Sequence, residues 1–393
     1  MSILGLYLHI PFCKQRCNYC DFNTYAGIEN YISDYTAVLC EEIIRAGQFI
    51  DRSISVNTIY FGGGTPSLLQ IDHIKQIVQV IKENINVKTN SEITFEVNPG
   101  TVSRGYLSAL YQLGINRLSI GMQTGNKNEL EMLGRIHTLE DVKNTIAWAN
   151  EGGFQNISLD LIFGLPGQTM QSWKKSVNAA IKLQPKHLSL YALTIEANTP
   201  LARDIENNYI SRCSDDLAAD MYEWAIESLP VNGFKQYEIS NWASVEKEEI
   251  NYQCAHNLQY WRNDDYIGVG AGAHSHYINK RWENISDIPG YINAWRLSIA
   301  QNELFARINL IENDLRTEMQ ETMMLGLRLV EEGVSKKDFY NKYKKEIIQE
   351  FRTEIDQLIR LGLVKWGQNE EEMLKLTKRG LLMGNQVFMY FVN

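Results

Sequence analysis

The sequence predicts an α/β protein: a partial, open (βα)6 barrel of the TIM type, followed by a mostly helical, winged-helix-like C-terminal domain. Strand-like and helix-like segments alternate six times between residues 4 and 193. Strands that are joined by helices run parallel, with right-handed crossovers. Polar residues or glycines follow nearly every strand, and such positions meet at one mouth of a βα barrel. Six units in place of eight leave the barrel open.

Each element follows from a local pattern. The expected strands are short apolar runs bounded by turn residues, at 4–10, 58–61, 93–97, 117–120, 157–162 and 187–193. The expected helices carry apolar residues at helical spacing, at 31–49, 71–85, 106–113, 139–150 and 170–183.

After residue 199 the pattern changes. We expect a helix at 217–229, a strand at 234–240, and then further helices and two short strands at 315–330, 337–344, 347–361, 362–366 and 373–377. The stretch between them is mixed and rich in aromatic residues, Asn, Asp and Gly. The sequence therefore predicts three units: a barrel core at 1–240, a linking region at 241–310 and a helical, wing-like domain at 311–393.

Composition excludes several classes of function. The net charge of −9, without a basic stripe, argues against a nucleic-acid partner. The acidic tract Glu370–Glu372 falls where a DNA-reading wing would face phosphates. Six cysteines in 393 residues fit a reducing compartment, and neither a signal peptide nor an apolar run long enough for a transmembrane segment occurs. We expect a cytoplasmic protein, with peripheral membrane attachment left open.

Three cysteines organise the chain. Cys13, Cys17 and Cys20 follow the first expected strand with the spacing C-x3-C-x2-C. Three thiolates can hold three irons of a [4Fe–4S] cluster and leave the fourth iron open for chemistry. A structural zinc site is the alternative, but zinc takes four ligands and no second C-x2-C pair occurs. A disulfide fits poorly because the number is odd. The spacing favours an iron–sulfur cluster.

Glycines and polar residues follow other strands. Gly62–Gly64, with Thr65 and Pro66, would let a ligand approach the backbone closely and meet its N–H groups. A tight strand–helix turn is the plainer alternative. Four polar residues lie near strand ends: Glu96, Gln123, Arg135 and Asp160. Such carboxylates could hold the hydroxyls or amine of a nucleotide-like ligand, although each residue could also be a surface residue or a structural hydrogen-bonding group.

A second motif, H-N-x-x-Y-W, runs from His256 to Trp261 and includes Tyr260. Imidazole is a good axial ligand for heme iron, and Tyr and Trp offer flat apolar faces with a polar edge. The alternative is a histidine whose hydrogen bonds are satisfied inside an aromatic cluster.

The run Leu6–Cys13, the three cysteines and the Gly-Gly-Gly-Thr-Pro turn resemble the radical S-adenosylmethionine superfamily. Within it, nearly the whole chain resembles the HemN/HemW family. The resemblance implies a [4Fe–4S] cluster whose open iron is chelated by S-adenosylmethionine, and cleavage of that cofactor to methionine and a 5′-deoxyadenosyl radical. It also implies an electron donor, either a flavodoxin- or ferredoxin-type protein or a reduced nicotinamide.

The same resemblance assigns roles by position. Tyr7, Gly63 and Glu96 would contact S-adenosylmethionine, Tyr19 would lie near the cluster, and His274 would lie near the cofactor. The positions that contact a second S-adenosylmethionine in the oxidase branch are Gly64, Thr65, Gln123, Arg135 and Asp160.

Phe22 stands where the oxygen-independent coproporphyrinogen III oxidases of this family carry a fourth cysteine. Their long N-terminal extension is also missing, since Cys13 lies so near Met1. Both features resemble the heme chaperone branch, and H-N-x-x-Y-W resembles its heme-binding motif. The resemblance implies a protein that binds heme and hands it to acceptor proteins. The alternatives are oxidative decarboxylation of coproporphyrinogen III and radical chemistry on another substrate.

Overall fold

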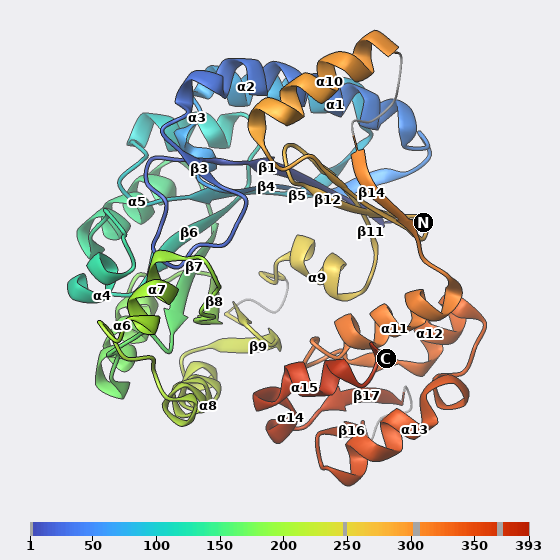
Figure 1. Cartoon of the computed structure of the whole chain (residues 1–393). Helices are drawn as coiled ribbons and strands as arrows, with labels where there is room; N and C mark the ends of the chain where they lie inside the picture. The colour runs from blue at the N-terminus through green and yellow to red at the C-terminus, as the bar shows by residue number, and fades with distance from the viewer. Residues whose placement is uncertain (1–2, 247–249, 302–306, 368–371, 393) are drawn as a thin grey trace.

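A computed structural model of the protein describes residues 3–246, 250–301, 307–367 and 372–392. Its main feature is a 12-stranded sheet that bends around the short helix α9 (Ala255–Trp261). Helices cover the outer face of the sheet, and the C-terminal domain lies beside its open side (Figure 1). The predicted α/β fold, with a partial barrel and a helical C-terminal domain, is confirmed.

The centre of the sheet is parallel, in the order β11-β1-β4-β5-β6-β7-β8. The bounds are β1 Ile3–Ile10, β4 Ser55–Gly63, β5 Val87–Val97, β6 Arg117–Gln123, β7 Asn156–Phe163, β8 His187–Ala192 and β11 Asp265–Val269. The helices of this part are α1 Ile32–Phe49, α2 Ile71–Asn84, α3 Arg104–Gln112, α4 Lys127–Met132, α5 Leu139–Glu151, α6 Met170–Lys182, α7 Pro200–Glu206 and α8 Asp215–Val231. Six of these parallel strands are the ones that the sequence predicts, and β11 is an addition.

Alternation along each strand separates the core from the barrel interior. In β1, Leu4, Leu6 and Leu8 are buried in the core between sheet and helices. Because successive side chains point to opposite faces, Tyr7 and His9 face the interior. Each fully buried leucine contributes roughly 1.5–3 kcal/mol, so the outer face stabilises the fold while the inner face is free to carry polar groups.

Antiparallel strands extend both ends of the parallel sheet. They are β9 Phe234–Glu238 and β10 Asn241–Ser244 beside β8, and β12 His274–Tyr277, β13 Lys280–Asn284 and β14 Arg307–Glu312 beside β11. The helix α10 (Ile288–Gln301) packs on α1. The sheet therefore runs on through the residues predicted to be a linking region, where short polar strands carry little apolar alternation. The predicted domain boundaries themselves stay a prediction.

The C-terminal domain has its own core and a three-stranded sheet in the order β15-β17-β16. Its elements are α11 Leu315–Gly326, β15 Val334–Ser335, α12 Lys336–Tyr343, α13 Ile347–Arg360, β16 Val364–Trp366, β17 Met373–Leu376, α14 Lys378–Leu382 and α15 Gly384–Met389. The wing-like pair β16–β17 matches the prediction, whereas Glu370 and Glu371 of the acidic tract lie outside the described residues. No helix among the described residues is long and apolar enough to cross a membrane.

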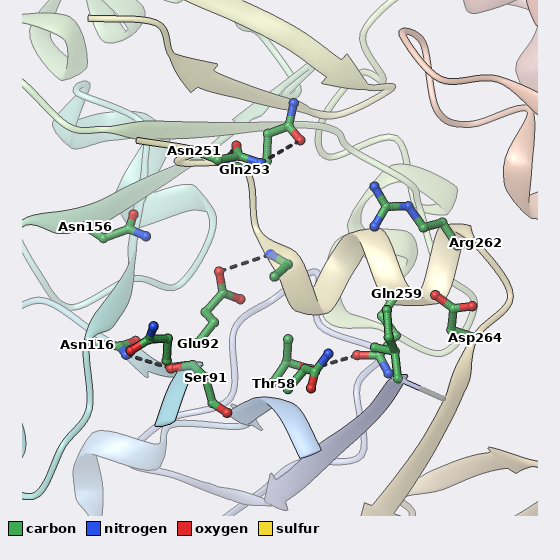
Figure 2. Close-up of a pocket in the computed structure, with 14 residues that line it drawn as sticks. Thr58, Ser91, Glu92, Asn116, Asn156, Asn251, Gln253, Gln259, Arg262 and Asp264 are labelled. Carbon is green, nitrogen blue, oxygen red and sulfur yellow. Dashed lines mark hydrogen bonds between the residues drawn. The ribbon is translucent and has the colours of Figure 1, made fainter. Parts of the chain in front are cut away.

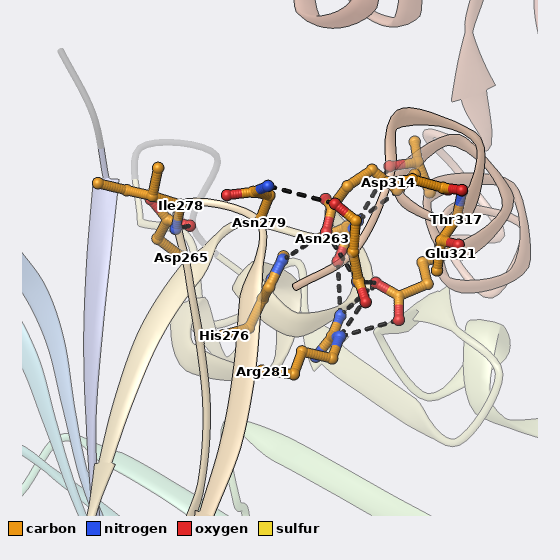
Figure 3. Close-up of polar contacts among 12 residues, drawn as sticks. Asn263, Asp265, His276, Ile278, Asn279, Arg281, Asp314, Thr317 and Glu321 are labelled. Carbon is orange, nitrogen blue, oxygen red and sulfur yellow. Dashed lines mark hydrogen bonds and ion pairs between the residues drawn. The ribbon is translucent and has the colours of Figure 1, made fainter. Parts of the chain in front are cut away.

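A buried polar network joins the two parts of the chain (Figure 3). Arg281 on β13 pairs with Glu321 on α11 at 2.6 Å, and His276 Nε2 lies 3.1 Å from Glu318 Oε1. The side chain of Asn313 donates to both carboxylates. His276 and the two glutamates are close enough to hold a metal ion, but Arg281 and Asn313 already satisfy the carboxylates. The network is therefore a joint between the barrel and the C-terminal domain.

Glu42 on α1 anchors the glycine-rich segment after β11. Its buried carboxylate accepts hydrogen bonds from Gly270 N at 2.8 Å, Asn284 Nδ2 at 2.6 Å and the Tyr291 hydroxyl at 2.5 Å, and burial raises its pKa to about 7. Glu42→Ala would leave these three donors without an acceptor, at about 1–3 kcal/mol each. We expect the free energy of unfolding, measured in urea, to fall by about 3 kcal/mol or more.

The neighbouring Glu41 provides the matched control. It pairs with Arg45 near the surface of the same helix, so Glu41→Ala should change the free energy of unfolding by less than about 1 kcal/mol. Equal effects of the two substitutions would contradict the anchoring role of Glu42.

Candidate functional site

The cysteine loop leaves the end of β1 and is fixed at both its base and its tip. β2 (Phe12–Cys13) pairs with β3 (Tyr25–Ala26) at the base. Near the tip, Asn18 Nδ2 donates to Met132 O and Asn18 O accepts from Leu201 N, both at 2.9 Å. The loop is thus tied to segments that follow β6 and β8. Phe22 points to solvent, with 69% of its surface exposed.

Hydroxyl groups and a guanidinium surround the sulfurs. The hydroxyls of Thr65 and Thr24 lie 3.7 Å from Cys13 Sγ and Cys20 Sγ. Burial raises the pKa of Cys13 and Cys17, and the positive charge of Arg135 offsets part of that rise at Cys17. Cys13 and Cys17 therefore need a bound metal to be deprotonated near neutral pH.

The distances between the three cysteine sulfurs help to distinguish a single zinc ion from an iron–sulfur cluster. His, Cys, Asp and Glu side chains can bind a metal ion together when their donor atoms lie close to one another. Among the described residues, only His276, Glu318 and Glu321 form a group of three whose donor atoms all lie within 4.8 Å of one another. At least one pair of the three cysteine sulfurs therefore lies more than 4.8 Å apart. A single zinc ion about 2.3 Å from each sulfur would draw them closer than that. The wider arrangement fits a cluster in which each iron takes its own cysteine.

The glycine turn after β4 brings backbone donors to a carboxylate. Gly63 N donates to Glu96 Oε2 at 3.2 Å, and the Tyr60 hydroxyl donates to Oε1 at 2.9 Å. Gly63 has a φ of +113°, and a Cβ there would lie 2.7 Å from the His9 ring, so only glycine fits. Burial inside the barrel raises the pKa of Glu96 to about 7, and the charge of Asp160 adds to the rise.

A chain of hydrogen bonds links several predicted residues. Arg135 donates from Nη2 to the Tyr19 hydroxyl at 2.7 Å and from Nη1 to Asn98 Oδ1 at 2.6 Å. Asn98 Nδ2 in turn donates to Thr65 Oγ1 at 2.9 Å, and Thr65 reaches Cys13. Asn98, the residue after β5, completes this chain and was not among the predicted site residues.

The other predicted positions lie around the same sheet without joining that chain. Asp160 on β7 accepts from the Ser119 hydroxyl at 2.9 Å, and burial raises its pKa. Gln123 ends β6 with a left-handed φ of +62° and is buried. Gly64 packs so tightly that a Cβ would lie 3.0 Å from Cys13 Sγ. His274 is exposed on β12 and lies 3.2 Å from Glu283.

The helix α9 carries the second motif into the barrel. Glu92 accepts from Ala255 N at 3.0 Å (Figure 2) and from His256 N at 3.1 Å, which satisfies the first turn of the helix. His256 is 1% exposed and stacks on Tyr60 and Tyr7, with ring centroids 5.1 and 6.4 Å apart. Tyr7 therefore lies between α9 and the residues predicted to hold S-adenosylmethionine.

The hydrogen bonds of His256 define its protonation state. The Thr58 hydroxyl donates to Gln259 Oε1, so its oxygen is left to accept from His256 Nδ1 at 2.8 Å. His256 Nε2 then accepts from the Tyr260 hydroxyl at 2.9 Å. Burial, aided by the charge of Arg117, lowers the pKa of His256 to about 3. The imidazole is neutral, and both nitrogens have partners inside an aromatic cluster, as in the structural alternative considered from the sequence.

The C-terminal end of α9 is held by the C-terminal domain. The Arg328 guanidinium lies 4.3 Å from the centre of the Trp261 ring. Arg262 pairs with Glu332, and Lys342 donates to Asn263 O at 2.6 Å. The motif is thus clamped between the barrel and the C-terminal domain.

A pocket of about 440 Å³ opens beside α9 at the amino ends of the strands. Figure 2 shows that its labelled lining is almost entirely polar. Amide side chains dominate it: Asn57, Asn90, Asn116, Asn156, Asn251, Gln253 and Gln259. Such a lining offers little apolar surface to a flat aromatic ligand.

Two family patterns match the chain: the radical SAM superfamily over residues 7–180 and the HemN C-terminal domain over residues 313–383. The heme chaperone HemW of Bacillus subtilis is 36% identical, with 98% of each chain covered. That of Lactococcus lactis is 34% identical, with 98% of this chain and 96% of the relative covered.

A solved structure of coproporphyrinogen III oxidase (HemN) from Escherichia coli shares the fold, with a TM-score of 0.82 over 99% of this chain and 90% of that one at 23% identity. The superfamily implies a [4Fe–4S] cluster and S-adenosylmethionine as cofactors, which agrees with the donor set of the cysteine loop. The sequence similarity along the full length shows that this chain belongs to the HemW family of radical SAM proteins.

Proposed function

We propose that this protein is a heme chaperone, which binds heme on α9 and hands it to acceptor proteins. One observation supports this most directly: the hydrogen bonds of His256 leave Nε2 as an unprotonated lone pair. That is the form in which imidazole ligates iron, and a hydrogen bond at the other nitrogen is what usually orients such a ligand. Iron binding at Nε2 requires the Tyr260 hydroxyl, which donates to that atom in the heme-free protein, to move away.

In this proposal the carboxyl ends of the strands hold the cofactors. Cys13, Cys17 and Cys20 would hold the cluster, which when bound would supply an electron for the chemistry of S-adenosylmethionine. Tyr7, Gly63 and Glu96 hold that S-adenosylmethionine. The positions assigned to a second molecule are Gly64, Thr65, Gln123, Arg135 and Asp160, and His274 is assigned a place near the cofactor. The electron comes from a flavodoxin- or ferredoxin-type protein or from a reduced nicotinamide.

One anaerobic preparation with a reconstituted cluster can test the proposal. We expect one heme to bind per chain with a defined Soret band, and to move to an acceptor apoprotein. We expect no protoporphyrinogen from coproporphyrinogen III beyond background. Multiple turnovers of that conversion would overturn the chaperone proposal in favour of the oxidase.

The pKa of Glu96 predicts how S-adenosylmethionine binding depends on pH. A carboxylate accepts hydrogen bonds from the hydroxyls or amine of a cationic ligand more strongly when it is ionised. With a pKa of about 7, Glu96 is mostly protonated at pH 6 and mostly ionised at pH 8. The affinity, measured by anaerobic calorimetry, should therefore rise about tenfold between these values.

Glu96→Gln should flatten this profile and weaken binding at pH 8 by about tenfold or more. The comparison also removes the ligand's own titration, which is common to both proteins. Glu140→Gln, on the surface of α5 beside Lys143, should leave the profile unchanged. An unaltered profile in Glu96→Gln would show that another group responds to pH.

A further inference from the structure

The polar pocket at the amino ends of the strands contains amide side chains that the fold does not use. Asn57 lies on β4, Asn90 on β5 and Asn156 at the start of β7. Among the described residues, none forms a hydrogen bond with these three side chains, and Asn156 Oδ1 is buried without a partner. Both ends of the Asn116 amide, by contrast, bond to the backbone of β5. Three strands therefore bring unengaged amides to one pocket.

A second cavity adjoins this pocket. Its volume is about 270 Å³, and it shares Arg262 and Asp264 with the first. Unlike the first, it is lined largely by apolar side chains, which are Trp261, Leu329, Val334, Phe339 and Met373. The two cavities form one groove past the C-terminal end of α9, with a polar part in the barrel and an apolar part against the C-terminal domain.

This division fits an extended polypeptide. Each peptide unit presents one N–H donor and one C=O acceptor, and an Asn amide offers the matching acceptor and donors. An apolar side chain of the same segment would fill the second cavity, as anchor residues do in peptide-binding grooves. A sugar would leave the apolar part empty. A nucleotide phosphate would need a cation, whereas Arg262 is already paired with Glu332.

The groove and the proposed iron ligand share one helix. Ala255, Gln259 and Arg262 line the groove, and their spacing of four and three residues places them on one face of α9. His256 and Tyr260 lie on a different face and bond to each other inside the barrel. A partner in the groove would therefore contact α9 without covering His256. We propose that the groove binds an extended segment of the heme acceptor through its backbone and one apolar side chain, a choice of partner that rests on the proposed heme function.

A random dodecapeptide library displayed on phage tests the groove on the full-length protein. Selection should enrich peptides that share an apolar residue, and a synthetic copy of the most enriched peptide should bind in calorimetry. An ester scan replaces one peptide N–H at a time by oxygen and keeps the side chains. Its affinity should fall about threefold to tenfold at one position or more. Exchanging the shared apolar residue for glycine should weaken binding at least tenfold.

The double variant Asn57→Ala/Asn156→Ala should bind this synthetic peptide at least tenfold more weakly than the wild type. Because neither amide bonds to the protein, the midpoint of thermal unfolding should not change. Asn128→Ala, which removes an exposed amide on α4, is the matched control and should bind the peptide normally. Failure of the library to enrich any peptide, or equal affinity of the double variant and the wild type, would overturn the groove as a peptide site.

Heme transfer separates this inference from the chaperone proposal. The double variant should keep the Soret band of the wild type, because His256 bonds to Thr58 and Tyr260 and to neither amide. It should pass heme to the acceptor apoprotein at least tenfold more slowly. Transfer at the wild-type rate would overturn the acceptor as the partner. Failure of the wild type to bind heme would overturn the chaperone proposal, while the peptide titration would still decide whether the groove binds a polypeptide.

Discussion

Cys17→Ser should abolish the iron–sulfur cluster. Cys17 is one of only three cysteines in the loop, and Cys13 and Cys20 alone would leave a cube with two protein ligands. The loop is held by hydrogen bonds from both the side chain and the backbone of Asn18, so it cannot easily offer another donor. After anaerobic reconstitution, bound iron should fall from about four atoms per chain to a trace, with loss of the cluster's visible absorbance.

Cys213→Ser is the matched control. Its thiol donates to the backbone of Ser214 at 3.5 Å, in the segment before α8 and far along the chain from the loop. Iron and sulfide contents should equal those of the wild type. A complete cluster in Cys17→Ser, with iron and sulfide as in the control, would contradict the assignment of Cys17 as a ligand.

His256→Ala should remove the defined heme complex. The proposed iron ligand is Nε2, the atom that accepts from Tyr260 at 2.9 Å. Without the imidazole, the Soret band should lose the position and intensity of a histidine-ligated heme, and affinity should fall by at least tenfold. The cluster should be unaffected, because its ligands lie at the opposite end of the strands. An unchanged Soret band would remove His256 as the ligand.

Tyr260→Phe sharpens the same test. It removes the hydroxyl that occupies Nε2 but keeps the aromatic ring that packs against His256 at a centroid distance of 4.9 Å. Since a buried hydrogen bond contributes about 0.5–1.5 kcal/mol, its removal should tighten heme binding about threefold to tenfold. Weaker binding would mean that the Tyr260 hydroxyl contacts the heme.

The barrel shows which helices and strands can be predicted from local sequence patterns. The six predicted strands and the helices between them are present in the structure. Their apolar residues recur with a period of two in strands and 3.6 in helices, which places these residues on one face that can be buried. The strands β11 to β14 have short, largely polar stretches, so their place in the sheet depends on partners far away in the chain. Periodicity alone could not reveal them.

The candidate site likewise combines residues that the sequence predicts with contacts that only the fold creates. The spacing of Cys13, Cys17 and Cys20 and the motif around His256 could be read from the sequence, because residues close in the chain stay close in space. The hydrogen bonds of Glu96 with Gly63 and Tyr60 join separate strands and had to come from the fold.

By itself, then, the sequence determined the cofactor loop, the alternating barrel units, the wing-like domain and the family. Only the tertiary structure decided the charge states inside the barrel: a Glu96 with a pKa of about 7 and a neutral His256 whose Nε2 lone pair accepts from the Tyr260 hydroxyl. The reason is physical. Protonation and pairing are set by burial and by neighbours from other strands, and these exist only once the sheet has closed around α9.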